Sequence, residues 1–278
     1  MNTLYDTVCQ SCSELITKEY STSFSLGIRV FDAKFRAPIY AIYGFVRFAD
    51  EIVDTFENVD NRALLERFRK DTFLAIEEKI SLNPVLHSFQ RVVNEYAIDH
   101  HLITAFLDSM AMDLTMDAHD EVSYKQYIYG SAEVVGLMCL HVFLEGNKQR
   151  YAELVTSACA LGSAFQKVNF LRDMKSDFIE RGRVYFPDVD FENFTDQDKH
   201  RIEADIQSEF DLAYTGIVQL PKGVKLGVYT AYKYYLSLFE KIKNNPKENI
   251  LQDRVRIPNG KKLYLLTTSA LKNSFNLL

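Results

Sequence analysis

The most regular feature of the chain is the spacing of its apolar residues. They recur three and four positions apart almost everywhere, whereas runs of strict alternation bounded by turn residues are hard to find. This pattern predicts an all-α fold. The predicted breaks fall at turn-forming pairs such as Asn83-Pro84 and Gly146-Asn147. We expect helices over residues 3–19, 37–55, 62–79, 84–95, 101–116, 124–145, 150–181, 196–212 and 220–243, with a last helix after Asn259.

The predicted helices follow one another without a visible domain boundary. No Ser- or Gly-rich linker, charge run or internal repeat divides the chain. A single domain of packed helices over residues 1–278 is therefore the simplest interpretation. Pro38 lies near the start of its predicted helix, where a missing backbone donor is tolerated if the helix begins there.

Charge and hydropathy narrow the class of protein. The chain has 32 Lys and Arg residues and 38 Asp and Glu residues, which gives a formal net charge of −6. A nucleic-acid partner would require a basic face. The first residues lack the basic start and apolar run of a secretory signal. The apolar stretch 134–144 is well short of the roughly 20 residues that span a bilayer. We expect no nucleic-acid partner, no membrane span and a cytoplasmic location.

The cysteines do not suggest a disulfide or zinc framework. Four cysteines in 278 residues are too few for a disulfide scaffold. Cys9 and Cys12 form one CxxC pair, and no second pair follows to complete four zinc ligands. We interpret all four as thiols in a reducing compartment.

A first stripe of polar residues follows one helix face. Tyr43, Arg47, Asp50 and Asp54 are spaced by four, three and four positions, so they share a face. Carboxylates four residues apart repel each other unless a positive charge lies between them. A solvated acidic surface is the simpler alternative, and a divalent cation is the functional one.

A second stripe repeats this pattern and favours the functional interpretation. Gln166, Asn169, Asp173 and Asp177 are spaced by three, four and four positions among apolar neighbours. Acceptors that point into a helix bundle are costly unless they bind something. Two facing stripes could hold Mg²⁺, whose ligands are carboxylates, water and phosphate. Nearby arginines match phosphate oxygens and so indicate a diphosphate; they are Arg47, Arg172, Arg181 and Arg183.

Several segments, taken in chain order, resemble one known family. They are YSTSFSL from Tyr20, AIYGFVRFADEIVD, MAMDL from Met110 to Leu114, YGSAEVVGLM, QKVNFLRDMKSDFIERGRVYFP, and near the end YLSLFEKI and DRVRIPNGKKL. Together they resemble the squalene/phytoene synthase family, the head-to-head prenyl synthases, over essentially the whole chain. The resemblance implies an all-α bundle of the isoprenoid-synthase type that binds two prenyl diphosphates in a central cavity.

The resemblance also assigns roles to individual residues. The expected metal ligands, for Mg²⁺ or its substitute Mn²⁺, are Asp50, Asp54, Asp173 and Asp177. The expected catalytic residues are Tyr43, Arg47, Tyr235 and Arg254. The expected substrate-binding residues are Ser21, Phe24, Arg47, Gln166, Asn169, Arg172, Arg183 and Lys262.

Three positions depart from the family pattern. Tyr20 stands where many relatives have His, Ser109 where a Gly often precedes the Met-x-x-Asp-Leu segment, and Glu133 where many have Gly. None of them is one of the four expected metal ligands. Glu133 lies on an apolar helix and needs a partner that the sequence does not identify.

Within the family, the YGSAEVVGLM segment and the absence of a C-terminal anchor resemble the bacterial phytoene synthases. The implied reaction joins two geranylgeranyl diphosphates through a cyclopropyl (prephytoene) diphosphate to phytoene, without NADPH. The alternatives are a 30-carbon squalene or dehydrosqualene synthase that uses farnesyl diphosphate, and a non-catalytic assembly protein of the same fold. Chain elongases and terpene cyclases usually carry Asp-Asp-x-x-Asp, whereas this chain has DEIVD and DMKSD. We expect a monomer, with a peripheral contact at the inner membrane face as a route for product release.

Overall fold

The computed structural model describes residues 3–116, 118–175, 182–187, 189, 194–246, 255, 257, 258 and 269. In this part of the chain the regular structure is helical, and strand-like pairing is limited to one isolated bridge between Ala118 and Val184. The all-α prediction is confirmed. The helices are α1 (Leu4–Tyr20), α2 (Thr22–Arg29), α3 (Ala33–Asp54), α4 (Asn61–Glu78), α5 (Pro84–Tyr96), α6 (His100–Asp113), α7 (Glu121–Ile128), the π-helix η1 (Tyr129–Glu133), α8 (Val134–Phe143), α9 (Lys148–Lys175), α10 (Asp196–Ile217) and α11 (Lys222–Lys243).

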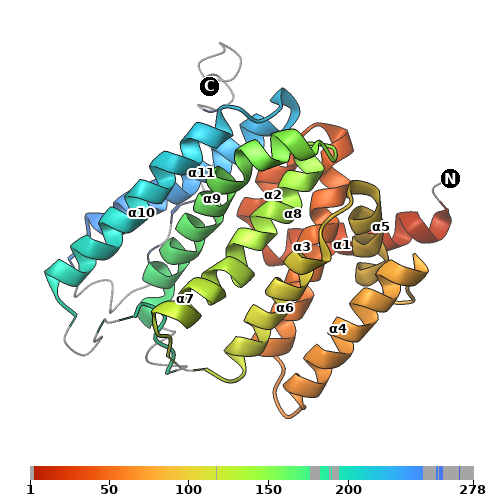
Figure 1. Cartoon of the computed structure of the whole chain (residues 1–278), viewed down its shortest axis with the longest axis horizontal. Helices are drawn as coiled ribbons and strands as arrows, with labels where there is room; N and C mark the ends of the chain where they lie inside the picture. The colour runs from red at the N-terminus through yellow and green to blue at the C-terminus, as the bar shows by residue number, and fades with distance from the viewer. Residues whose placement is uncertain are drawn as a thin grey trace.

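The helices pack as a bundle with α9 near its centre (Figure 1). On one side α9 packs against α10 and α11, and on the other against η1 and α8. The N-terminal half is held together by contacts among α1, α3, α5 and α6. No helix within the described ranges is both long and apolar enough to pass through a membrane.

Local sequence signals explain where several helices begin. Thr3 and Asp6 form a reciprocal capping box at α1, and Thr195 and Asp198 form another at α10. At α5 the Asn83 side chain accepts hydrogen bonds from the amides of Val85 and Leu86, next to a proline in the first turn. These caps satisfy amide donors that have no partner within the helix.

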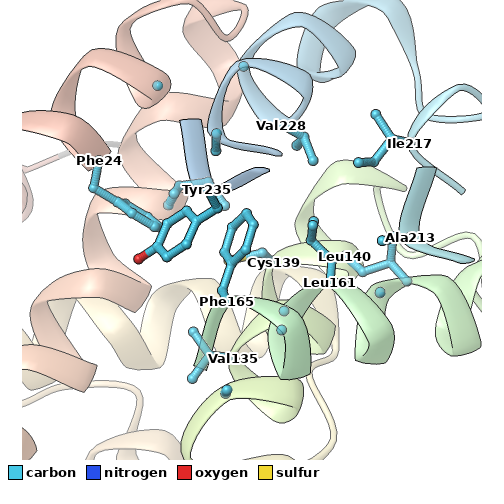
Figure 2. A pocket seen from close by; sticks show the side chains of 18 of the residues that line it. Phe24, Val135, Cys139, Leu140, Leu161, Phe165, Ala213, Ile217, Val228 and Tyr235 are labelled. Atoms are coloured by element: carbon cyan, nitrogen blue, oxygen red, sulfur yellow. The ribbon is translucent and has the colours of Figure 1, made fainter. Parts of the chain in front are cut away.

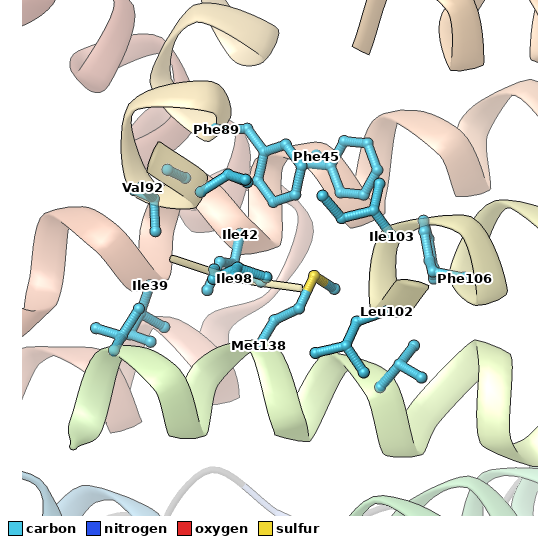
Figure 3. Packing of buried hydrophobic residues seen from close by; sticks show 14 of the residues in the cluster. Ile39, Ile42, Phe45, Phe89, Val92, Ile98, Leu102, Ile103, Phe106 and Met138 are labelled. Carbon is cyan, nitrogen blue, oxygen red and sulfur yellow. The ribbon is translucent and has the colours of Figure 1, made fainter. Parts of the chain in front are cut away.

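A large apolar cluster holds the inner face of α3. The Phe45 ring, fully buried, stacks on Phe89 with centroids 3.9 Å apart and lies 5.5 Å from Phe68. Ile103 and Met138 close the same cluster (Figure 3). Because one face of α3 is fixed in this core, its other face, which carries the first polar stripe, is held in a defined orientation.

Three expectations about helix boundaries were wrong. The second predicted helix begins at Ala33, so Pro38 lies inside α3 and leaves the Lys34 carbonyl without its helical donor. The short helix α2 was not predicted; the Ser21 side chain caps it by accepting from the Phe24 amide at 3.2 Å. The predicted helix 124–145 is instead α7, η1 and α8, with the π-helical turn at Tyr129–Glu133.

The π-helical turn coincides with a close contact that only glycine permits. A Cβ on Gly130 would lie 2.4 Å from the Ala105 carbonyl oxygen and 2.7 Å from Ser109 Cβ. Gly130→Ala should therefore lower the free energy of unfolding by about 1–3 kcal/mol, because η1 and α6 must separate. Urea denaturation measures the change.

Gly27→Ala in α2 is the matched control, since its added Cβ would have its nearest neighbour at 3.9 Å. The free energy of unfolding of Gly27→Ala should equal that of wild type or be slightly higher, because alanine favours a helix over glycine by up to about 1 kcal/mol. Equal stability of the two variants would contradict the steric explanation.

Candidate active site

The described helices enclose a cavity of about 490 Å³ between α2, α3, α8, α9, α10 and α11. Its walls are mostly apolar, with Val135, Leu140, Leu161 and Val228 among the side chains that point inward (Figure 2). Small residues keep the space open. Seven residues predicted from the sequence line it, namely Ser21, Phe24, Tyr43, Gln166, Asn169, Arg172 and Tyr235.

Aromatic rings stand inside this cavity (Figure 2). Phe165 and Tyr235 stack with centroids 3.9 Å apart, and the Phe24 and Tyr43 rings lie 5.2 Å apart. The Tyr235 hydroxyl donates a hydrogen bond to Asn169 Oδ1 at 3.3 Å. Burial raises the pKa of Tyr235, so its hydroxyl stays protonated at neutral pH. Phe165, an apolar neighbour of Gln166 in the second stripe, was not among the predicted site residues.

The first acidic motif continues from the cavity wall to the end of α3. Tyr43 lines the cavity, and Arg47 follows one turn later. The two terminal nitrogens of Arg47 donate to Asp50 and to Glu51. Glu51 was not predicted, although its position next to Asp50 in the motif could have indicated it. The arginine therefore neutralises the middle of the motif.

The second acidic motif lies at the end of the described part of α9. Arg172 Nε donates to Asp173 Oδ1 at 3.0 Å, and its Nη2 donates to Oδ2 at 2.5 Å. This two-point pairing fixes the plane of the guanidinium beside the cavity. Asp177, Arg181, Arg254 and Lys262 lie outside the described residues, so their roles stay predictions.

Arg183 joins the ends of two helices. Its Nη1 donates to Asp54 Oδ1 at 3.1 Å, and its Nη2 donates to the Asp113 carbonyl oxygen at 3.0 Å. The segment that carries Arg183 is anchored by Tyr185, whose ring stacks on Phe170 at 4.1 Å. A segment beyond α9 thus supplies a positive charge to the C-terminal ends of α3 and α6.

Asp113 is a buried carboxylate that the sequence analysis did not assign to the site. Its side chain is 7% exposed and accepts a hydrogen bond from the Tyr127 hydroxyl at 3.1 Å. Burial raises the pKa of Asp113 to about 7; Arg183 opposes this shift, while Asp54 and Asp50 add to it. The signal that could have found it is its place within the Met110–Leu114 segment.

The oxygen donors of the two acidic motifs are of the ligand type that Mg²⁺ prefers. The side chains of Asp50, Asp54 and Asp173 are 33%, 24% and 20% exposed, so solvent can reach these hard oxygen donors. Within the described ranges, no three ligating side chains converge on one point. Mg²⁺ usually takes one or two carboxylates and completes its shell with water and substrate phosphate.

Glu133 has a partner outside this charged region. The Cys159 thiol hydrogen-bonds its carboxylate, and Lys167 contributes a favourable charge. Burial is the main reason that the pKa of Glu133 is raised, and Glu209 adds repulsion. All four cysteines are unpaired thiols.

The chain is similar to known proteins of one family. A family model described as squalene/phytoene synthase matches residues 17–261. The phytoene synthase of Cereibacter sphaeroides is 26% identical, with 94% of this chain and 79% of that protein covered. The phytoene synthase of Arthrospira platensis is 27% identical, with 92% and 91% covered.

Solved structures share the fold. A dehydrosqualene synthase in complex with a ligand superposes with a TM-score of 0.83, at 21% identity and with 96% of both chains covered. A squalene synthase from Alicyclobacillus acidocaldarius gives a TM-score of 0.77 at 17% identity, with 87% of this chain and 95% of that chain covered. At this identity the likeness establishes the architecture alone.

The raised pKa of Asp113 predicts a pH-dependent stability. Between the ordinary value of 3.8 and about 7, the folded protein binds the Asp113 proton more tightly than the unfolded chain does. Stability should therefore fall as pH rises through this window, by at most about 1.4 kcal/mol per pH unit. Asp113→Asn should remove this loss, so its stability relative to wild type should increase from pH 4.5 to 7.5 in urea titrations.

Asp108→Asn is the matched control for this experiment. Asp108 lies on the same helix, pairs with Arg69 and has a side chain that is 49% exposed. The free energy of unfolding of Asp108→Asn, plotted against pH, should run parallel to that of wild type. Parallel curves for Asp113→Asn and wild type would show that Asp113 does not titrate in this range.

Proposed function

The chain belongs to the squalene/phytoene synthase family, whose members are prenyltransferases, and from that premise we propose that it is a phytoene synthase. The reaction we propose joins two geranylgeranyl diphosphates head to head and serves carotenoid biosynthesis. Relatives named phytoene synthase, matched over nearly the whole chain, support this choice of branch. The observation that supports the chemistry is an apolar cavity lined by Tyr43, Asn169 and Arg172, residues that stand on the same helix segments as the acids Asp50 and Asp173.

The charged end of the cavity would bind the diphosphate groups. Asp50, Asp54 and Asp173 would hold Mg²⁺, which neutralises negative charge on the leaving diphosphate. Arg172, at the cavity wall, and Arg47, one turn beyond Tyr43, carry guanidinium groups that match phosphate oxygens. Their present carboxylate partners hold these groups close to where a diphosphate would enter.

The apolar part of the cavity would hold the prenyl chains. Loss of diphosphate leaves an allylic carbocation, which must be kept from water until the double bond of the second substrate attacks it. The stacked rings of Phe165 and Tyr235 present π faces in this space, and π faces attract cations. We propose that the condensation passes through a cyclopropyl diphosphate whose second ionisation leads to phytoene.

The final step in this proposal is loss of a proton and not addition of a hydride. In the presence of Mg²⁺, the enzyme should therefore convert 20-carbon diphosphate into a 40-carbon hydrocarbon with the mass of phytoene. Adding NADPH should change neither the rate nor the product. Product analysis by chromatography and mass spectrometry, with separate incubations of 15-carbon and 20-carbon diphosphate, checks this. A product two hydrogens heavier with NADPH, or turnover of the 15-carbon substrate alone, would contradict the assignment.

Metal and diphosphate should stabilise the protein jointly. Each ligand completes the coordination of the other, because the carboxylates bind Mg²⁺ incompletely without phosphate and the arginines are already paired with acids. We expect the shift in melting temperature with Mg²⁺ and inorganic diphosphate together to exceed the sum of the separate shifts. Differential scanning fluorimetry measures all three shifts.

Asp50→Asn is the control variant for this measurement. It removes one expected ligand from a side chain that is one third exposed, so its melting temperature without ligands should stay close to that of wild type. Its joint shift should be lost, together with turnover. Additive shifts in wild type would argue against a shared site.

A further inference from the structure

The guanidinium group of Arg47 is held from three directions. Its two terminal nitrogens donate to Asp50 and Glu51, as described above. One face is covered by the ring of Tyr20, whose centroid lies 4.4 Å from Arg47 Cζ. Arg47 Nε is buried and has no hydrogen-bond partner within the described part of the chain. Nε is thus a buried donor whose hydrogen-bonding capacity is unused within the described part of the chain.

The helix end that carries Tyr20 is held in place by packing. Tyr20 is the last residue of α1 and shares a helix face with Ser13 and Thr17, which are fully buried. This face packs closely on α3, where a Cβ on Gly44 would lie 3.2 Å from Ser13. The Ser25 hydroxyl donates to the Thr17 carbonyl oxygen at 3.1 Å and ties α2 to the same turn.

The Tyr20 ring is poorly explained as a packing residue. Tyr20 is 51% exposed, so removing its side chain leaves no cavity in the core. Its ring face, not its hydroxyl, meets Arg47.

We propose that Tyr20 is a positioning residue for Arg47. By covering one face of the guanidinium, the ring fixes the plane in which Nε and the terminal nitrogens point, so that they meet the diphosphate of an incoming substrate in a defined orientation. The proposal rests on the proposed function for the identity of that substrate. It assigns to an exposed residue on α1 a role beside the acids and arginines of the site, which otherwise come from α3, α6, α9 and the segment around Arg183.

The test compares two substitutions at Tyr20. Binding of inorganic diphosphate in the presence of Mg²⁺ is measured by isothermal titration calorimetry, and kcat and KM are measured with 20-carbon diphosphate. Tyr20→Leu should weaken diphosphate binding and lower kcat/KM by about 3- to 10-fold, the range for a partly exposed cation–π contact. Tyr20→Phe keeps the ring and should restore both values to within about twofold of wild type.

Two controls separate positioning from general structural effects. Leu15→Ala changes a more exposed residue of the same helix, at 59% exposure, and should leave diphosphate affinity unchanged. In an Arg47→Lys background, Tyr20→Leu should cause little further loss of diphosphate affinity, because lysine has no planar group to orient. Melting temperatures of all variants should lie close to their parents.

The outcomes distinguish this proposal from the proposed function. Equal loss of diphosphate binding in Tyr20→Phe and Tyr20→Leu would assign the effect to the hydroxyl and overturn the positioning role, and so would an unaffected Tyr20→Leu. If wild type binds Mg²⁺-diphosphate in a Tyr20-dependent way but makes no phytoene, the positioning role stands and the product assignment fails. If wild type does not bind Mg²⁺-diphosphate, both fail.

Discussion

Negative charge concentrated at helix ends is the constraint on which the site depends. α3 ends at Asp54 and α6 ends at Asp113, and a helix C-terminus already carries a partial negative charge. Carboxylates in these places are unfavourable unless positive charge lies close by. Arg183 supplies it by crossing from the segment beyond α9 to both helix ends. The cluster therefore couples three parts of the chain that are distant in sequence.

The two faces of α3 have different roles. One face of α3 is buried in the cluster around Phe45, where large side chains pack at van der Waals distance. The opposite face carries Tyr43, which lines the cavity, and Arg47, which is one turn further along and is bonded to Asp50. A polar group on a rigid, half-buried helix keeps its position better than one on a loop, so the packing of the core determines the precision of the site.

The sequence predicted the parts of this arrangement that depend on one helix at a time. Spacing by three and four residues identified the polar faces of α3 and α9, and the structure brings Tyr43, Gln166, Asn169 and Arg172 to one cavity. Which residues on other helices meet these faces depends on tertiary packing. Asp113 is flanked by Met112 and Leu114, and its importance becomes visible only when Arg183 and Tyr127 are placed beside it.

The predictions that failed also depend on tertiary packing. Pro38 was read as a boundary because its local preference is to start a helix, but the burial of α3 on both sides of Pro38 outweighs one missing hydrogen bond. The short helix α2 has too few residues for a periodic pattern, and its position depends on the Ser21 cap and on contacts with α11. Phe165 was missed because apolar spacing cannot distinguish a packed ring from one that faces a cavity.

The ion pairs between arginines and carboxylates also affect how ligands would bind at the site. Arg47, Arg172 and Arg183 are each bonded to an acid of the two motifs, so these guanidinium groups are partly neutralised. Binding of a metal and a diphosphate would then exchange partners, with carboxylates turning to the cation and guanidinium groups to phosphate. Because they are already paired, the guanidinium groups of Arg47 and Arg172 are oriented before any ligand binds.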